Sequence, residues 1–558
     1  MSSSHRPPPV PMPPARARHA SDSALLAFLA EAERVVVWGL GLSGRAVLGA
    51  FSGVPEAVTV RPEVALPAST PGGRDANAAA DGGASVAAAH QDLDPLARLR
   101  VAPESMAPGS SEGEADLFGR VRTRLDAGLI DIAAFDSRAE ALAALTSHTS
   151  RAQPGATPAV RPLASERALL DALDAKTLLV VSPGVSLTHC IREVLGSGAR
   201  LTTDLELGLA AFAGRVALIT GTNGKSTVTA MLGAMVEASD APAFVGGNLG
   251  IPTMALWSWA QRADPAAIAV IEASSYQLEY APAVRADAAV LTSFSEDHLA
   301  RHRTLSAYGR AKLQALLALP GRAEAVVSGA DPAAVALARA AGRPLHVASD
   351  ADLEALEAAH GRALEGHDRI NAACAVSVAR QFGLSLDAVR AGLAAFRPLP
   401  HRLATVGEAA GVRFVNDSKA TNVGAAVVAI QAMAGRGPLT VLVGGSEKGG
   451  SYAPLIAALK AHASCTILVG AAAPRLAAAL ETAALPLLRA HDLATATALA
   501  ADRAAEGAAA LTPTTVLLAP ACASFDAFTS FEARGSAFES AARAWLAAHA
   551  SPSKPSSL

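Results

Sequence analysis

Cysteine is scarce in this chain of 558 residues. The four cysteines are far apart and form no C-x-x-C pair, so the sequence indicates neither a disulfide framework nor zinc ligands of ordinary spacing. They are Cys190, Cys374, Cys465 and Cys522. Such cysteine usage is typical of a reducing compartment, and we expect a cytoplasmic protein.

A strong excess of charge is also missing, because the formal net charge is −3 and acids and bases are intermixed. This excludes the electrostatic footprint of a nucleic-acid-binding protein. No apolar run is long enough to cross a bilayer, since Pro, Arg or Glu interrupts each alanine-rich stretch. Residues 1–23 are rich in Pro and Arg without an apolar core, which predicts a disordered tail and neither a signal peptide nor an anchor. We therefore expect a soluble protein without nucleic-acid or membrane partners.

Three α/β domains fit the length and the order of the motifs, and we predict them at residues 24–212, 213–399 and 400–551. In the first, a strand precedes glycines in G-x-G-x-x-G spacing, a pattern typical of nucleotide-binding turns. Residues 52–127 are rich in Ala, Gly, Pro and Ser without periodicity, which predicts an inserted, largely disordered loop. The stretch LIDIAAFDSR, residues 129–138, then predicts the second strand.

The stretch VALITGTNGKSTVTA, residues 216–230, is the main motif of the second domain. An apolar strand leads through Gly221 and Gly224 into a helix whose unpaired N–H groups attract an anion. Lys225 adds a positive charge, and the Ser-Thr pair after it is suited to hold Mg²⁺ against a bound phosphate. An isoleucine replaces the first glycine of the usual G-x-x-x-x-G-K-[ST] pattern. The alternative is a glycine-rich turn with a solvated lysine.

Three further side chains of the second domain are candidates for a metal site. Glu272 and His298 each end an apolar strand, at the edge where ligands bind in open α/β sheets. Beside the phosphate loop this pair suits Mg²⁺, although imidazole is an unusual ligand for so hard an ion. A strand-end Glu and His satisfied by local hydrogen bonds is the alternative. Lys312 lies in a predicted helix, where a solvated lysine is the ordinary expectation.

The third domain alternates strands with alanine-rich helices, which favours another mostly parallel sheet. Polar residues follow three of its strands: Asp417 and Lys419 follow VRFV, Lys448 follows VLVGG, and Ser524 and Phe531 follow VLLAP. Because the carboxyl ends of parallel strands share one edge, these loops predict a binding face. Any one of them alone is better explained as an ordinary turn.

Taken in order, the runs TGTNGKST, GGNLG, EASSYQLE, SEDHLARH, AYGRAK, LPHR and NDSKATN resemble the Mur ligases, from about Val35 to the end apart from the insertion. The resemblance implies an N-terminal Rossmann-like UDP-binding domain, a central P-loop ATPase-type domain and a C-terminal Rossmann-like domain for an amino acid. It implies an ATP-dependent ligase that adds D-glutamate to UDP-N-acetylmuramoyl-L-alanine through an acyl phosphate, in peptidoglycan precursor synthesis. We expect a monomer that acts on these small molecules.

The resemblance also implies roles for the residues that bind ATP and Mg²⁺. The catalytic set is Lys225, Glu272, His298 and Lys312. Lys312 matches a lysine that the family carries as a carbamate, an anion that binds Mg²⁺ where an ammonium would repel it. The ATP phosphates are assigned to Gly221, Thr222, Asn223, Gly224, Lys225, Ser226 and Thr227, the base and ribose to Asn371, Arg402 and Asp417, and Mg²⁺ to Ser226, Glu272, His298 and Lys312.

Substrate contacts follow from the same resemblance. For UDP they are Leu42, Ser43, Ser137, Arg138 and Gly184; for the acyl substrate, Asn248 and Ser274; and for D-glutamate, Thr421, Lys448, Ser524 and Phe531. Two positions depart from the family pattern, because Asp368 stands where Asn is frequent and Ser446 where an acid is sometimes found.

Two alternative functions stay open at the level of sequence. One is a sister ligase for another amino acid or for folate. Against it, the D-N-P-R run of the diaminopimelate or lysine enzymes is missing, and the loop has GKST where folate enzymes favour GKGS. The other is a P-loop protein that changes conformation with nucleotide and forms no covalent product.

Overall fold

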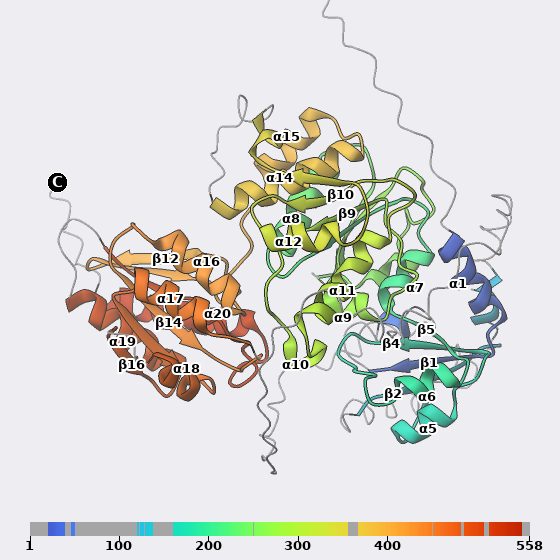
Figure 1. Cartoon of the computed structure of the whole chain (residues 1–558), viewed down its shortest axis with the longest axis horizontal. Helices are drawn as coiled ribbons and strands as arrows, with labels where there is room; N and C mark the ends of the chain where they lie inside the picture. Colours follow the sequence, from blue (N-terminus) through green and yellow to red (C-terminus); the bar gives the residue numbers. More distant parts are fainter. Residues whose placement is uncertain are drawn as a thin grey trace, which may run out of the picture. The chain divides into compact units, whose positions relative to one another are not determined.

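The computed structural model describes residues 20–39, 46–48, 50, 120–121, 123–125, 127, 129–137, 160–248, 250–354, 366–448, 450–480, 485–506 and 513–549. It contains three sheets whose strands alternate with helices (Figure 1), which confirms the predicted three-part α/β fold. By internal packing, the chain groups into two compact units. The first is Met1–Ile219, Ser239–Ala289 and Gln314–Glu324, and the second is Thr220–Ala238, Val290–Leu313 and Ala325–Leu558.

The first sheet has five parallel strands in the order β3-β2-β1-β4-β5. Its strands are β1 (Arg34–Trp38), β2 (Asp131–Phe135), β3 (Val160–Pro162), β4 (Thr177–Val181) and β5 (Arg200–Thr202). The helices of this part are α1 (Ala20–Glu31), α5 (Glu166–Asp171), α6 (Ile191–Gly196) and α7 (Asp204–Ala210). The stretch predicted as the second strand is β2, and it pairs in parallel with β1.

Part of the predicted insertion is folded. Residues 120–121 and 123–125 are helical, and Val121 and Leu125 are completely buried in the core of the first sheet. The prediction of a disordered loop over 52–127 is wrong for these residues, because two apolar side chains four positions apart form one stripe of a helix. Most of the rest of this segment, and most of the predicted tail 1–23, lie outside the described residues.

The second sheet has six strands in the order β11-β10-β9-β6-β8-β7. They are β6 (Arg215–Thr220), β7 (Ala243–Gly247), β8 (Ile268–Glu272), β9 (Ala288–Leu291), β10 (Ala325–Ser328) and β11 (Leu345–Ala348). The intervening helices are α8 (Lys225–Glu237), η2 (Thr253–Trp257), α9 (Ser275–Glu279), α10 (Leu299–His302), α11 (Leu305–Leu317), α12 (Pro332–Arg339), η3 (Asp350–Asp352), α14 (Gly366–Gln381) and α15 (Leu386–Ala395). The prediction that His298 ends a strand is wrong, since β9 ends at Leu291 and His298 is the left-handed residue before α10.

The third sheet has six strands in the order β12-β13-β17-β14-β15-β16, of which only β12 is antiparallel to its neighbour. They are β12 (Ala404–Ala409), β13 (Val412–Asn416), β14 (Leu439–Gly444), β15 (Cys465–Val469), β16 (Leu487–Arg489) and β17 (Thr514–Leu518). The helices are α16 (Val423–Met433), α17 (Ala453–His462), α18 (Ala473–Leu480), α19 (Leu493–Glu506) and α20 (Phe531–Ala548). Separate apolar clusters pack on the two faces of this sheet.

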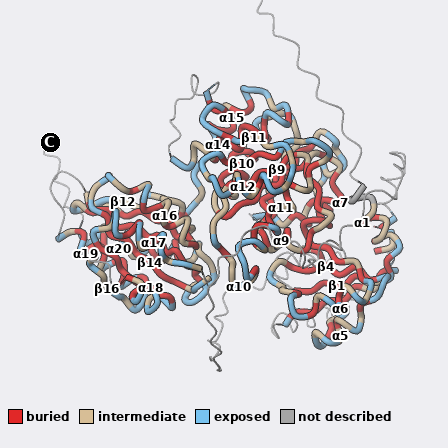
Figure 2. Tube along the Cα trace, in the orientation of Figure 1, coloured by how far each residue is buried: buried red, intermediate tan, exposed pale blue. Residues whose placement is uncertain are grey.

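The central strands are buried throughout (Figure 2), and β4, β8, β14 and β17 contain no exposed residue. Such continuous apolar runs are typical of parallel strands covered by helices on both faces. Within the described part of the chain, every helix is too short or too polar to traverse a lipid bilayer.

Helix α8, whose first residues are the end of the phosphate loop motif, packs directly against α15. A Cβ added to Gly392 of α15 would lie 2.4 Å from the Cα and 2.5 Å from the backbone nitrogen of Met235. Because the nearest atoms belong to the backbone of α8, no side chain can move away to make room. Glycine at this position therefore sets how closely the two helices approach.

We expect Gly392→Ala to destabilise the protein by about 1–3 kcal/mol, because overpacking against a helix backbone displaces that helix. Gly196→Ala is the matched control, since it is also helical and a Cβ there meets no atom within 4 Å. Thermal denaturation of both variants measures the effect. An unchanged melting temperature for Gly392→Ala would contradict the packing described.

Candidate active site

The loop between β6 and α8 has the backbone geometry of an anion site. Gly221 and Gly224 have φ angles of 148° and 88°, which side chains disfavour. A Cβ at Gly221 would lie 2.0 Å from Thr292 Oγ1, and one at Gly224 would lie 2.7 Å from Asn371 Oδ1. Gly224 is the N-cap of α8, and no side chain caps this helix. The first turn of α8 therefore presents its N–H groups and its positive dipole end to the loop.

Two lysines contact the same carbonyl of this loop. Lys225 Nζ donates to Gly221 O at 2.9 Å and to Thr222 O at 2.8 Å. Lys312 Nζ, on α11, donates to Gly221 O at 2.6 Å. Lys312 is only 1% exposed, so the solvated alternative for this lysine is wrong. The two ammonium groups make the loop strongly electropositive, which favours a multiply charged anion.

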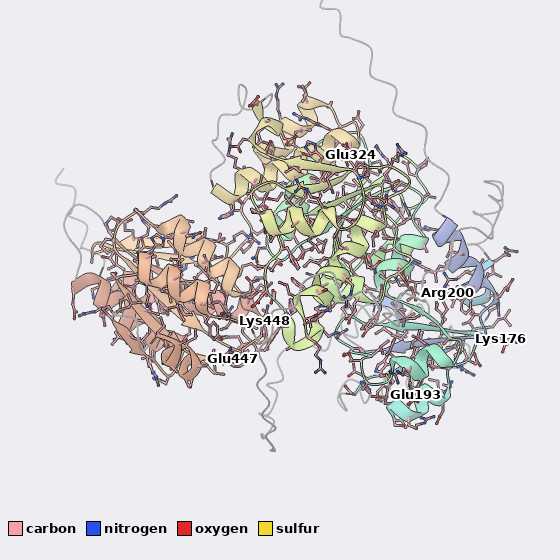
Figure 3. All side chains as sticks on the ribbon, in the orientation of Figure 1. Lys176, Glu193, Arg200, Glu324, Glu447 and Lys448 are labelled. Carbon is pink, nitrogen blue, oxygen red and sulfur yellow. The ribbon has the colours of Figure 1, made fainter. Side chains whose placement is uncertain are left out.

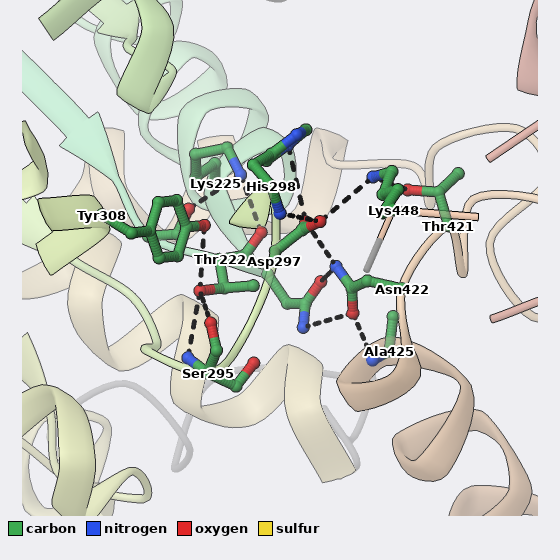
Figure 4. A network of polar contacts seen from close by, with 12 residues as sticks. Thr222, Lys225, Ser295, Asp297, His298, Tyr308, Thr421, Asn422, Ala425 and Lys448 are labelled. Atoms are coloured by element: carbon green, nitrogen blue, oxygen red, sulfur yellow. Dashed lines mark hydrogen bonds and ion pairs between the residues drawn. The ribbon is translucent and has the colours of Figure 1, made fainter. Parts of the chain in front are cut away.

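Tyr308 lies between the phosphate loop and two other candidate residues, Lys312 and His298. Its hydroxyl donates to Thr222 Oγ1 at 3.2 Å (Figure 4). Its ring centroid lies 4.4 Å from Lys312 Nζ and 6.4 Å from the centroid of His298. Sequence reasoning missed this residue. The only signal for it was its position four residues before Lys312, one helical turn away.

Asp297 is a second residue that sequence reasoning missed, and it is the centre of the network in Figure 4. Its carboxylate is buried, lies 3.3 Å from Lys448 Nζ and 3.6 Å from His298 Nε2, and accepts a hydrogen bond from Asn422 Nδ2 at 3.1 Å. A burial penalty for this charge is thereby offset by three polar partners. The partners belong to the segment after β9 and to two loops of the third sheet, and all lie in the second compact unit.

The charges around Asp297 are reflected in the protonation of its neighbours. Burial alone would raise the pKa of Asp297, but Lys448, His298 and Lys225 together lower it below its usual value. Burial lowers the pKa of His298 to about 4, and Lys448, Lys225 and Lys312 act in the same direction against the opposing charge of Asp297. At neutral pH the carboxylate is therefore ionised and the imidazole is neutral, which is the state in which histidine binds metals.

Asn223 of the loop and Asn422 of the third sheet form a reciprocal amide pair. Asn422 Nδ2 donates to Asn223 Oδ1 at 3.1 Å, and Asn223 Nδ2 donates to Asn422 Oδ1 at 3.4 Å (Figure 4). Asn422 is also the N-cap of α16 and accepts from the backbone nitrogen of Ala425 at 2.8 Å. The phosphate loop is thus tied directly to the first turn of α16.

Buried oxygens of the kind that binds a cation occur in two places, at the start of α8 in one compact unit and at the end of β8 in the other. Ser226 is buried, and Thr227 Oγ1 and Glu272 Oε2 are buried without a hydrogen-bond partner among the described residues. The other carboxylate oxygen of Glu272 accepts from Asn248 Nδ2 at 2.7 Å. Glu272 is in register with Ile219 of β6, two residues before Gly221. An orphaned carboxylate oxygen and hydroxyls of this kind are the ligand types that Mg²⁺ prefers.

The predicted ATP residues of the third domain include a buried acid beside an arginine. Burial raises the pKa of Asp417 to about 6, although the charge of Arg402 opposes this shift. Arg402 Nε is also buried without a hydrogen-bond acceptor among the described residues. Arg402 Nε therefore has unused hydrogen-bonding capacity, whereas the Asp417 carboxylate is acted on by a backbone hydrogen bond from Leu403.

The predicted amino-acid residues lie on loops after three strands of the third sheet. Lys448 Nζ is 3.5 Å from Thr421 Oγ1, and Ser524 is buried. Glu447 and Lys448 are labelled in Figure 3; Glu447 pairs with Arg475 at 2.8 Å, whereas Lys448 pairs with Asp297. Phe531 begins α20, and Lys419 Nζ lies 4.0 Å from its ring centroid. Lys419 therefore contacts a residue predicted to bind D-glutamate, although it was not itself among the predicted residues.

The predicted UDP residues are only partly described. Gly39 follows β1 with φ 93°, and its carbonyl accepts from Ser182 Oγ at 2.6 Å. This bond joins the end of β1 to the turn after β4 that contains Gly184, while Ser137 is exposed just after β2. Leu42, Ser43 and Arg138 lie outside the described residues.

The predicted acyl-substrate residue Ser274 already has a structural role. It is the N-cap of α9 and forms a capping box with Gln277, in which Ser274 Oγ accepts from Gln277 N at 3.3 Å and donates to Gln277 Oε1 at 3.0 Å. Asn248 contacts Glu272, as described above. Of the two residues, Asn248 is therefore the one that contacts a candidate metal ligand, Glu272.

Comparison with known proteins agrees with this geometry. The chain matches the Mur ligase middle domain over residues 219–371 and the Mur ligase glutamate ligase domain over residues 401–522. A relative from Sphingopyxis alaskensis is 38% identical over 379 residues, covering 66% of this chain and 84% of the relative. A relative from Anaeromyxobacter dehalogenans is 37% identical over 438 residues, covering 72% and 92%, and one from Myxococcus xanthus is 36% identical over 440 residues, covering 73% and 92%.

The chain belongs to the Mur ligase family. All three relatives carry the name UDP-N-acetylmuramoylalanine--D-glutamate ligase. The predicted family and the predicted enzyme class, an amide-forming ligase, are thereby confirmed.

His302, at the end of α10, makes the folding stability of the protein depend measurably on pH. Burial, and after it the charges of Arg301 and Lys312, lowers its pKa from 6.5 to about 4. Between these values the unfolded chain binds a proton that the folded protein does not, so stability falls as the pH falls through this window. We expect His302→Gln to reduce the loss of stability between pH 6.5 and pH 4, measured by urea denaturation. His491→Gln, at an exposed position, is the control and should keep the wild-type dependence.

Proposed function

We propose that the chain joins D-glutamate to UDP-N-acetylmuramoyl-L-alanine at the expense of ATP, through an acyl phosphate, in peptidoglycan precursor synthesis. The observation that carries this proposal is the convergence of Lys225 and Lys312 on the loop at the uncapped start of α8. The name that the similar relatives share, UDP-N-acetylmuramoylalanine--D-glutamate ligase, supports the identity of the substrates.

In this proposal the loop Gly221–Thr227 holds the ATP phosphates. The N–H groups of the first turn of α8 bind phosphate oxygens, and Lys225 leaves its contacts with Gly221 O and Thr222 O to bind them as well. Asn371, which lies beside Gly224, contacts the nucleotide base. Arg402 and Asp417 lie with it around the base and ribose, where Arg402 Nε, which has no acceptor among the described residues, donates to the nucleotide.

The metal assignment uses the oxygens that have no partner. We assign one Mg²⁺ to Ser226 and Glu272 and a second to His298, whose imidazole is neutral and so can donate a lone pair. Lys312 joins the second site as a carbamate, because an ammonium group would repel the ion. Mg²⁺ held by these residues would neutralise charge on the phosphoryl oxygens. Because these side chains are already in place, their charges need not rearrange during the reaction.

The remaining substrates are assigned to the other loops. Thr421, Lys448, Ser524 and Phe531 hold D-glutamate, with Lys448 paired to one of its carboxylates. Asn248 and Ser274 line the binding site of the acyl substrate. Leu42, Ser43, Ser137, Arg138 and Gly184 bind UDP. We further propose a cytoplasmic monomer with domains at residues 24–212, 213–399 and 400–551.

An acceptor screen tests this function. Purified protein is supplied with ATP, Mg²⁺ and UDP-N-acetylmuramoyl-L-alanine, and phosphate release is measured with D-glutamate, L-glutamate, L-lysine, meso-diaminopimelate or a folate substrate. We expect release only when both the UDP substrate and D-glutamate are present. Activity with a different acceptor would favour a sister ligase, and release with neither substrate would contradict the proposal.

Replacing Lys312 separates a ligase from a nucleotide-dependent switch. We expect Lys312→Ala to lower kcat at least about a hundredfold, as loss of a charged transition-state contact does, while nucleotide binding measured by calorimetry persists. Lys460→Ala, at an exposed lysine of α17, is the control. Thermal denaturation of both variants checks that the fold is intact. Unchanged turnover in Lys312→Ala would refute a role for this residue in the reaction.

A further inference from the structure

A cluster of three different metal-binding side chains lies outside the ligase site, beside the first sheet. Glu166 is the first residue of α5, and His189 and Cys190 directly precede α6. Their ligand atoms all lie within 4.8 Å of one another, and among the described residues this is the one such group of at least three His, Cys, Asp or Glu side chains. From this geometry we propose that Glu166, His189 and Cys190 form a binding site for Zn²⁺ or a similar borderline transition-metal ion.

The distances require little movement to accept an ion. With metal–ligand bonds of about 2.0–2.3 Å in a tetrahedron, neighbouring ligand atoms are about 3.3–3.6 Å apart. His189 Nε2 and Glu166 Oε1 are now 2.6 Å apart, in a direct hydrogen bond. Their side chains are 59% and 39% exposed, so they can separate by about 1 Å without disturbing packed neighbours. Cys190 is buried and provides the fixed ligand.

Neither the Glu166 nor the Cys190 side chain caps a helix. Ser165 caps α5 by accepting from Ala168 N, so the Glu166 carboxylate has no capping role, and the Cys190 side chain does not cap α6. Burial, and after it the negative charges of Glu166 and Glu193, raises the pKa of the Cys190 thiol to about 11, so an ion that binds the sulfur must displace its proton. Glu193 pairs with Arg167 at 3.0 Å, which leaves Glu166 as the carboxylate ligand (Figure 3 labels Glu193). The local negative potential favours a cation at the thiol.

The ligand types indicate which cation binds. Thiolate and imidazole select Zn²⁺ and similar ions over Mg²⁺, so this site is chemically distinct from the proposed magnesium sites of the ligase reaction. Three protein ligands leave a fourth position of a tetrahedral ion for water. An ion here would link α5 to the turn before α6, where Cys190 packs with Leu187 and Val194. The proposal does not depend on the proposed ligase function.

Cobalt binding tests this site, because Co²⁺ replaces Zn²⁺ and its bond to a thiolate produces a charge-transfer absorption band. The full chain is first stripped with a chelator and then titrated with Co²⁺ in excess Mg²⁺, which occupies the hard oxygen sites. We expect one equivalent to give the thiolate band and Zn²⁺ to displace it. Absence of the band in the wild type would overturn the proposal.

The variants identify the ligands. In Cys190→Ala the thiolate band should disappear. In His189→Gln the affinity for Co²⁺ should fall by more than about 100-fold, because loss of an outer-shell partner alone typically costs about 10- to 100-fold and loss of a direct ligand costs more. Cys465→Ala, which removes another buried cysteine from β15, is the matched control and should bind Co²⁺ as the wild type does. His189→Gln alters an exposed side chain, so it is informative even when Cys190→Ala does not fold. Wild-type binding by His189→Gln, or a thiolate band retained in Cys190→Ala, would refute the assignment.

Discussion

The contact of two lysine ammonium groups with one peptide carbonyl, Gly221 O, is the interaction on which the active site depends. Lys225 comes from the loop itself and Lys312 from α11, which is more than eighty residues further along the chain. The Gly221 carbonyl partly compensates both charges, and the Tyr308 ring partly compensates that of Lys312. A phosphate chain is a better partner than either, so the loop is preorganised for the ligand it is proposed to bind.

Close to this electropositive loop lie a negatively charged carboxylate, Asp297, and a neutral imidazole, His298. Asp297 remains ionised although buried, because Lys448 and Asn422 contact it, and His298 beside it is held neutral. One positive lysine from the third sheet therefore meets a negative group from the second. This pairing joins the loop that is proposed to receive D-glutamate to the segment after β9. The Asn223–Asn422 pair joins the phosphate loop to the same side of the third sheet, and transfer between the two ligands requires such proximity.

The sequence predicts the parts of this site that repeat a pattern. Strands β1, β2, β4, β6, β8, β13, β14, β15 and β17 are apolar runs, and the glycines and Lys225 form a recognisable motif. Short strands such as β3, β5 and β16 carry no such run. Tyr308, Asp297 and Asn422 were missed because their roles depend on contacts across 86, 151 and 199 residues respectively. The Glu166, His189 and Cys190 cluster was missed for the same reason, since its ligands follow no metal-binding spacing.

The four hydrogen bonds of Asn422 limit what evolution or design can place at this position. Its carbonyl oxygen accepts from Ala425 N and from Asn223, and its amide nitrogen donates to Asn223 and Asp297. Every bonding position of the side chain is used. Ser, Thr or Asp would still begin α16 but would lose at least one donor, and Gln would place the amide one methylene too far. A residue that is ordinarily interchangeable at helix starts is here the one amino acid that satisfies all of its neighbours.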